Sequence, residues 1–262
     1  MSSKNQRPDR RARAEQMRKE RERAAKRRRN GITIGIVVVV VALIAVAGFG
    51  IYQATEDDAE AGSTPSGATS DGGFVVDQKA LTGESSGDAP VDVVLYEDFQ
   101  CPGCKAFETS TRSIVDQYIK DGTINVEYRP LNFIDGNMGG QTEYSLKSAN
   151  AAICVYEEAG AKAFYELHTQ LFDNQMEEGG PGFTDQQYED FAGEVGADGV
   201  GSCISDMPYG DFVKDTTKAF LKEGYSSTPT ILVDGEALKG ESEGTLPTPD
   251  AFKAAIDKAA QS

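Results

Sequence analysis

The longest apolar run of the chain lies near its N-terminus. Residues 32–52 read ITIGIVVVVVALIAVAGFGIY and carry no charge. About 20 apolar residues in a helix are enough to cross the ~30 Å hydrocarbon core of a bilayer. The run therefore predicts one transmembrane helix over residues 31–52. The alternative is a cleaved signal peptide, because Ala45, Val46 and Ala47 resemble a cleavage site. The run exceeds the roughly 7–15 apolar residues of a signal peptide, which favours the uncleaved anchor.

Two polar segments flank this run. Residues 1–30 have a helix-forming composition rich in Lys and Arg but lack an apolar stripe, so they predict a basic arm without a partner helix. Residues 53–73 (QATEDDAEAGSTPSGATSDGG) contain no large apolar side chain and are rich in Gly, Ser, Thr and Asp. A segment of this composition cannot contribute to a core, so it predicts a flexible linker.

From Phe74 onward the pattern becomes that of a folded domain with strands and helices. Residues 91–98 (VDVVLYED) have the β-branched composition of a strand. Apolar residues at helical spacing follow, in a stripe that begins near Pro102 and ends at Gly122. Residues 123–129 (TINVEYR) then alternate as a half-buried strand does. The first half of the domain is therefore predicted to run strand, helix, strand.

The middle of the domain is helical throughout. Apolar residues keep a helical spacing from Tyr144 onward, and the last helical stripe of this part ends at Gly224. Thr184 and Gln187 have the spacing of a capping box, which marks the start of one of these helices. We expect a helical insertion over about residues 140–224.

Strand patterns return near the C-terminus. Residues 230–239 read as a hairpin around an Asp-Gly turn, and Thr248 followed by Pro249 marks the start of a final helix. Residues 74–262 are enough for one domain with a sizeable core. The order of elements predicts an α/β domain that a helical insertion interrupts.

Charge divides the chain at the same place as hydrophobicity. The formal net charge is −16, but residues 1–30 alone carry +9 and the residues after the apolar run carry −25. The positive-inside rule therefore predicts a single-pass protein of the cell membrane, with a cytoplasmic N-terminus and an extracytoplasmic domain. The basic arm is suited to contact anionic lipid of the inner leaflet. A domain of −25 repels phosphate, which excludes nucleic acid as its partner.

Two of the four cysteines form a C-x-x-C pair at a helix start. A thiolate of Cys101 would face the positive end of the helix dipole, which lowers a thiol pKa. Cys104, one turn further on, could then resolve a mixed disulfide with Cys101. The alternatives are an inert disulfide and a zinc half-site. Zinc usually needs four ligands, and the chain has one histidine, His168, and no second C-x-x-C. We therefore expect a redox-active disulfide, without metal or bound cofactor.

A second motif gives this pair a family resemblance. Far downstream, Ser227-Thr228-Pro229-Thr230 opens a strand, and Pro229 lies 128 positions after Cys101, beyond a mostly helical stretch. Residues 74–262 resemble the thioredoxin fold, and their helical insertion is similar to that of the DsbA-like branch. The resemblance implies that Pro229 is cis beside the redox pair and that the backbone of Thr228 binds substrate. From the residues alone, Pro229 could also be an ordinary trans residue.

The chain departs from the family pattern at two places. Many DsbA-like oxidases have a histidine where this chain has Gly103, so we expect a milder oxidant. A buried acid is often found where this chain has Leu95. Glu97 or Asp98 is near enough to act as the proton relay instead, although the pattern favours a solvated strand end for either residue.

The other two cysteines lie within the helical insertion. In an oxidising compartment Cys154 and Cys203 favour a structural disulfide, with two buried thiols as the alternative. His168 lies in an apolar helix stripe, which indicates a core or interface histidine rather than a catalytic one.

Together these features predict a membrane-anchored thiol:disulfide oxidoreductase. We expect an oxidase that forms disulfides in exported, unfolded proteins, and the resemblance implies reoxidation by a membrane partner of the DsbB or VKOR type. The alternatives are a reductase or isomerase and a non-catalytic thioredoxin-like binding or sensor module.

Overall fold

The computed structural model describes residues 63–85, 87, 89–242 and 244–261. The predicted basic arm at residues 1–30 and the predicted transmembrane helix at residues 31–52 lie outside the described residues. Among those that are described, no helix is both long and apolar enough to cross a bilayer.

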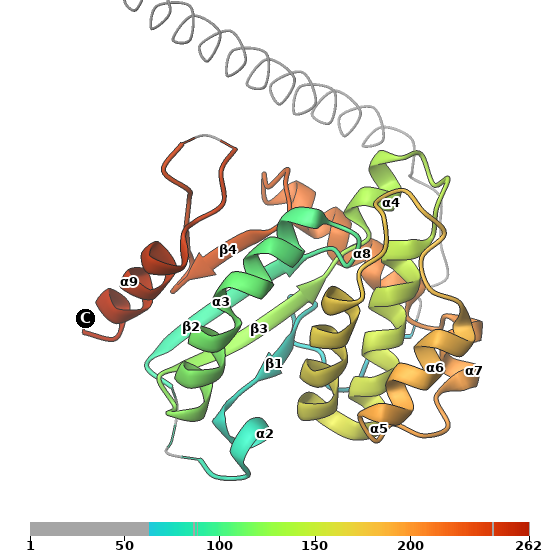
Figure 1. The fold of residues 1–262 in the computed structure, drawn as a ribbon, viewed down its shortest axis with the longest axis horizontal. Coiled ribbons are helices and arrows are strands. Elements are labelled where there is room, and N and C mark those ends of the chain that lie inside the picture. The colour runs from blue at the N-terminus through green and yellow to red at the C-terminus, as the bar shows by residue number, and fades with distance from the viewer. Residues whose placement is uncertain (1–62, 86, 88, 243, 262) are drawn as a thin grey trace, which may run out of the picture. The chain divides into compact units, whose positions relative to one another are not determined.

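A five-stranded mixed sheet forms the centre of the domain (Figure 1). Strands β2 and β3 are parallel neighbours, and the other pairs are antiparallel. Across the sheet the order is β1 (Phe74–Val76), β3 (Ile124–Pro130), β2 (Val91–Glu97), β4 (Thr230–Val233) and β5 (Glu236–Ala237). The β-branched residues that predicted β2 are inside, since Val91 and Val93 have no exposed surface. Strand β2 is therefore held between two partners, and its C-terminal end opens into the loop before Cys101.

Two helices pack against each other and against the sheet, one on β3 and the other on β4. Helix α3 (Pro102–Lys120) follows β2 directly, and α9 (Pro249–Ala259) starts with Thr248 as the N-cap, as the sequence predicted. The rings of Phe107 in α3 and Phe252 in α9 pack with their centroids 5.3 Å apart. In Figure 1, α9 lies on the opposite side of the domain from the helices α5 (Tyr144–Asp173), α6 (Asp185–Glu194) and α7 (Gly201–Asp206).

A block of helices separates β3 from β4 in the chain. Thr184 and Gln187 form the predicted capping box at the start of one of them. The long helix α5 contains Gly160 at φ 81°, a left-handed conformation that interrupts it between its two apolar stripes. The block comprises α4 (Phe133–Asn137), α5 (Tyr144–Asp173), α6 (Asp185–Glu194), α7 (Gly201–Asp206) and α8 (Gly210–Lys222), and a short helix α2 (Gln78–Thr82) lies earlier, after β1.

A disulfide ties this helical block together. The structure joins Cys154 of α5 to Cys203 of α7, the two cysteines for which the sequence favoured a bridge. Their Cα atoms are 6.0 Å apart and their positions differ by 49 residues in the chain. The side chain of Asn150 supports the same contact, because its Nδ2 donates to the carbonyl oxygen of Cys203 at 3.1 Å.

The expected linker packs on the domain from residue 63 onward. Pro65 and Gly72 are buried, and the hydroxyl of Thr69 donates to the carboxylate of Glu127 at 2.7 Å. The prediction that residues 53–73 contribute nothing to packing therefore does not hold for residues 63–73. Small residues let the backbone approach the domain closely, and polar side chains then bond to it, so packing here needs no large apolar residue.

Candidate redox site

The two cysteines of the C-x-x-C pair lie at the junction of β2 and α3. Cys101 is the N-cap of α3, and Pro102 occupies the first turn, where its missing N–H costs no hydrogen bond. Both thiols are free, with Cys101 8% exposed and Cys104 0% exposed. The N–H of Cys101 donates to the carbonyl oxygen of Asp98 at 2.9 Å, which closes the loop between the strand and the helix. A substrate can therefore reach Cys101 but not Cys104.

The two thiols differ strongly in acidity. A hydrogen bond from the thiol of Cys104, together with the backbone N–H groups of Gly103 and Cys104, lowers the pKa of Cys101 to about 6. Burial raises the pKa of Cys104 well above its ordinary value, and its bond to Cys101 adds to this effect. At neutral pH Cys101 is thus the thiolate, which is the form that attacks disulfides, and Cys104 is the neutral thiol.

The strand β4 begins directly against the pair. The peptide bond between Thr228 and Pro229 is cis, as the family resemblance implied. The Sγ of Cys101 lies 3.3 Å from the carbonyl oxygen of Thr228. A Cβ placed on Gly103 would come 3.4 Å from the Cδ of Pro229, so these two residues are also neighbours. The fold thus brings together two motifs that are more than 120 residues apart in the sequence.

Asp98 is a structural residue of the loop. It is 0% exposed, so the interpretation as a solvated strand end is wrong. Its carboxylate accepts hydrogen bonds from the N–H of Gln100 at 2.9 Å, the N–H of Ile134 at 2.9 Å and the hydroxyl of Ser145 at 2.7 Å. Burial raises its pKa to about 7. Two of these bonds direct the carboxylate toward the start of α4 and α5, and the one from Gln100 holds the loop itself.

Glu97 is buried as well, at 4% exposure, so the solvated interpretation is also wrong for this residue. Its Oε2 lies 2.8 Å from the Nε2 of His168, and within the described part of the chain its Oε1 has no partner at hydrogen-bond geometry, although the side chain of Glu108 lies near enough to affect its pKa. Burial and the negative charge of Cys101 raise the pKa of Glu97 well above its ordinary value. The charge of Glu97 in turn raises the pKa of Cys104. Of the two acids predicted near the pair, Glu97 is therefore the one that is electrostatically linked to both sulfurs.

Glu108 and His168 form a buried cluster with Glu97, and the sequence analysis did not predict this cluster. Burial raises the pKa of Glu108 to about 8, while burial lowers that of His168 to about 4, so the ring is neutral at pH 7. His168 is 1% exposed, which confirms the prediction of a core histidine but not its contact with Glu97. A signal for Glu108 was available, because it stands four residues after Cys104 and three before Thr111 on the buried face of α3.

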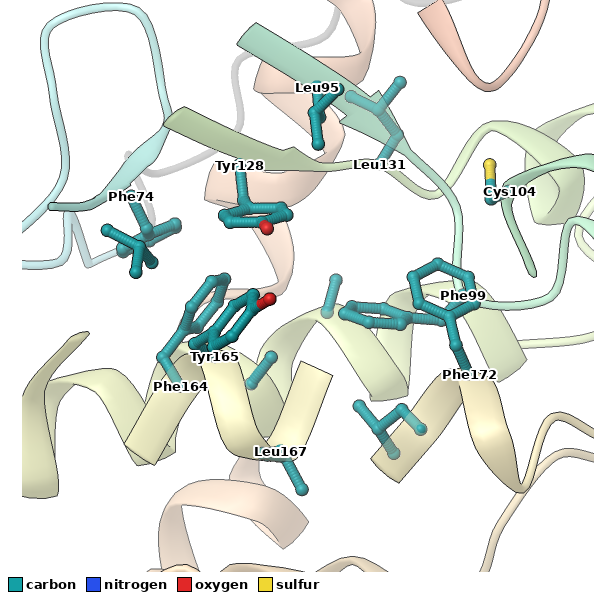
Figure 2. Close-up of a cluster of buried hydrophobic side chains, with 14 of the residues drawn as sticks. Phe74, Leu95, Phe99, Cys104, Tyr128, Leu131, Phe164, Tyr165, Leu167 and Phe172 are labelled. Carbon is teal, nitrogen blue, oxygen red and sulfur yellow. The ribbon is translucent and has the colours of Figure 1, made fainter. Parts of the chain in front are cut away.

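The cluster has ligand types that a metal ion could use. Glu97, Glu108 and His168 each place one ligand atom within 4.8 Å of the others. Aromatic rings enclose the histidine, with the centroids of Tyr128 and Phe172 at 4.5 and 4.9 Å from its own. Figure 2 shows Phe172 beside Phe99, on the Cys104 side of the core. The carboxyl groups of Glu97 and Glu108 have raised pKa values, so a proton can neutralise the cluster. A proton avoids the cost of bringing a hydrated metal ion into an apolar surrounding. This setting favours a proton over a metal.

The acidity of Cys101 can be measured directly. The ultraviolet absorbance of the thiolate in the reduced protein should rise with a midpoint at pH about 6, because the Cys104 thiol and the helix N–H groups stabilise the charge. Cys101→Ser should remove this transition, since Cys104 titrates far higher. A midpoint between about 8 and 9, the range of an ordinary thiol, would contradict the geometry described above.

Comparisons with known proteins agree with the site. The sequence matches the family Thioredoxin_4, described as thioredoxin, over residues 78–258. The chain belongs to this family. Oxidised DsbA from Mycobacterium tuberculosis is 27% identical with a TM-score of 0.59, over 72% of this chain and 93% of that one. Reduced DsbG from the same organism is 26% identical with a TM-score of 0.58, over 74% and 95%. BdbD from Bacillus subtilis, at 22% identity and a TM-score of 0.58 over 79% and 100%, shares the fold. No curated protein matches the chain.

The fold and the pair of free cysteines thus define a DsbA-like protein of the thioredoxin family. The chain is a thiol:disulfide oxidoreductase. The predicted thioredoxin fold is confirmed, and so is the prediction of an enzyme of this class.

Proposed function

We propose that the chain is an oxidase that forms disulfides in exported, unfolded proteins. The observation that carries this proposal is the lowered pKa of Cys101, about 6 against 9.0 for the free thiol. A lowered pKa of the Cys101 thiol stabilises the reduced protein. This stabilisation is complete at pH values above the ordinary thiol pKa, and it is lost as the pH falls through 6. At neutral pH the reduced form of the pair is therefore stabilised relative to the disulfide. A pair whose reduced form is stabilised takes electrons from its substrates and so oxidises them.

The exchange proceeds in two steps on the oxidised pair. A substrate thiolate attacks the sulfur of Cys101, the Cys101–Cys104 bond breaks, and its electron pair goes to Cys104. The sulfur of Cys104 takes a proton from Glu97, whose raised pKa favours the protonated form before this step. A second substrate thiolate then attacks the substrate sulfur of the mixed disulfide and releases Cys101 as a thiolate. The substrate loses two electrons and the pair gains two.

Substrate would bind beside the start of β4. The carbonyl oxygen of Thr228 lies next to the Cys101 sulfur, and Pro229 holds the turn. An extended substrate segment could bond to the backbone of Thr228 while its cysteine faces Cys101. The oxidising potential should be milder than in relatives with a charged histidine at the position of Gly103, because the backbone N–H groups act here without that added charge.

The sequence pattern supports a location at the outer face of the cell membrane. The predicted transmembrane helix, the basic arm in contact with inner-leaflet lipid and the acidic domain together favour this topology. The predicted linker over residues 53–73, of which residues 53–62 lie outside the described part of the chain, would tether the domain to the membrane. A short tether raises the effective concentration of the domain beside a membrane reoxidase of the DsbB or VKOR type.

A trapping variant tests the activity. Cys104→Ala should accumulate mixed disulfides between Cys101 and exported proteins, visible on non-reducing gels, because Cys104 can no longer attack the mixed disulfide and release the substrate. The matched control, Cys101→Ala with Cys104→Ala, should trap none. Absence of any mixed disulfide in the single variant would contradict the proposed function. The redox state in cells separates the directions: a mostly oxidised pair supports an oxidase, and a mostly reduced pair would identify a reductase.

A further inference from the structure

The end of helix α5 contacts the loop that carries Cys101. Gln175 lies two residues beyond the helix, and its Nε2 donates to the carbonyl oxygens of Phe99 and of Cys101, both at 2.9 Å. In the same stretch, the N–H of Gly179 donates to the Oε1 of Gln100 at 3.0 Å. Three consecutive residues at the redox site are thus bonded to a short segment of the helical block.

The side-chain amide of Gln175 bridges the two carbonyl groups on either side of Gln100, the residue before Cys101. The two N–H bonds of the Gln175 amide point to the carbonyls on either side of Gln100. The carbonyl of Cys101 also accepts the first bond of α3, from the N–H of Lys105 at 3.2 Å. For the carbonyl of Phe99, Gln175 is the donor that the described residues provide. Gln175 therefore fixes the orientation of the peptide groups on both sides of the turn into the helix.

This orientation governs the surroundings of the sulfur. The backbone N–H groups of Gly103 and Cys104 stabilise the thiolate only if the Cα–Cβ bond of Cys101 directs the sulfur toward them. Hydrogen bonds weaken steeply when their angle departs from linearity. A rotation of the Cys101 peptide would move the sulfur away from these donors, whereas α3 itself, which is held by Phe107 and the rest of the core, would stay in place.

We propose that Gln175 is a positioning residue that sets the redox property of the pair by holding the turn before Cys101. This rests on the proposed redox function of Cys101 and adds to it a residue of the helical block, 74 positions further along the chain. Gln175 itself is only half-buried, so water can bond to the freed carbonyls when the amide is removed. Its loss should therefore change the reactivity of Cys101 more than the stability of the fold.

The test compares two variants with a neighbouring control. Gln175→Met keeps the length of the side chain but removes both donors, and Gln175→Ala removes the side chain altogether. Asn174→Ala is the control, because the Nδ2 of Asn174 donates at 2.9 Å to Gln170 of its own helix and has no bond to the redox loop. In each purified protein we would measure the equilibrium constant with glutathione and the titration midpoint of the Cys101 thiolate.

In both Gln175 variants the titration midpoint of the Cys101 thiolate should lie about one pH unit higher. Their equilibrium constant with glutathione should favour the reduced pair about tenfold less, which is equivalent to about 30 mV in potential. Asn174→Ala should match the unaltered protein in both measurements. The inference is overturned if a folded Gln175→Met or Gln175→Ala keeps the original midpoint and equilibrium constant within twofold, or if Asn174→Ala shifts them equally. An unaltered protein that does not exchange with glutathione at all would instead refute the proposed function.

Discussion

Glu97→Gln is expected to slow the resolution of a mixed disulfide on Cys101 by about 100-fold at pH 7, because general acid-base catalysis typically contributes 10²–10⁴-fold. Cys104 must lose its proton to attack, and burial holds its pKa well above the ordinary value. Glu97 is buried beside the pair, with one carboxylate oxygen unpartnered and its charge coupled to both sulfurs. Glutamine preserves the size of the side chain but cannot take back the proton that Glu97 gives to Cys104 when the mixed disulfide forms. Quenched-flow analysis of a Cys101–glutathione mixed disulfide would measure the rate.

Two matched variants separate proton transfer from structural damage. Asp98→Asn should lower the free energy of unfolding with little change in this rate, because the Asp98 carboxylate bonds to Gln100, Ile134 and Ser145 instead of facing the pair. The rate of Glu97→Gln should recover as the pH rises, because hydroxide replaces the missing base. Equal rates for Glu97→Gln and the unaltered protein at pH 7 would show that solvent deprotonates Cys104 directly.

Local signals in the sequence were sufficient for the elements that carry the pair. The β-branched run of β2, the proline in the first turn of α3 and the capping box at Thr184 each depend on neighbours within a few residues. Part of the acidity of Cys101 follows from the same local geometry, because the Cys104 thiol and the N–H groups of Gly103 and Cys104 belong to its own helix, whereas the hydrogen bond with Thr228 that also lowers its pKa comes from a distant segment. Where a property is set by adjacent residues, the sequence is enough to predict it.

Properties set by distant contacts could not be predicted in this way. Whether Glu97 and Asp98 are solvated depends on helices that come later in the chain, and α4 and α5 bury both of them. The contact of His168 with Glu97 joins residues 71 positions apart, and an apolar stripe shows only that the histidine is inside. Gln175 had no distinguishing pattern, since a half-buried glutamine after a helix is common. The packing of residues 63–73 was missed because small and polar residues resemble a linker.

The redox pair and the structural disulfide should respond differently to mutation. Replacing Cys154 and Cys203 by alanine should lower the free energy of unfolding by about 4 kcal/mol, because the bridge closes a loop of about 50 residues and restricts the unfolded chain. This is a large share of the 5–15 kcal/mol by which most domains are stable. Exchange with glutathione should persist in the folded variant, since both cysteines lie in α5 and α7, away from the turn at Cys101.

Urea unfolding of the double variant beside the unaltered protein measures this loss. The single variant Cys154→Ala is the internal control, because it also breaks the bridge and should lose a similar amount of stability. A reductant adds a second comparison, made on proteins whose Cys101–Cys104 pair is already reduced: breaking the Cys154–Cys203 bridge should destabilise the unaltered protein toward the level of the double variant but leave the variant unchanged. Equal unfolding midpoints for the variant and the unaltered protein would mean that the loop is already restrained in the unfolded chain, so that the bridge adds nothing to the helical block.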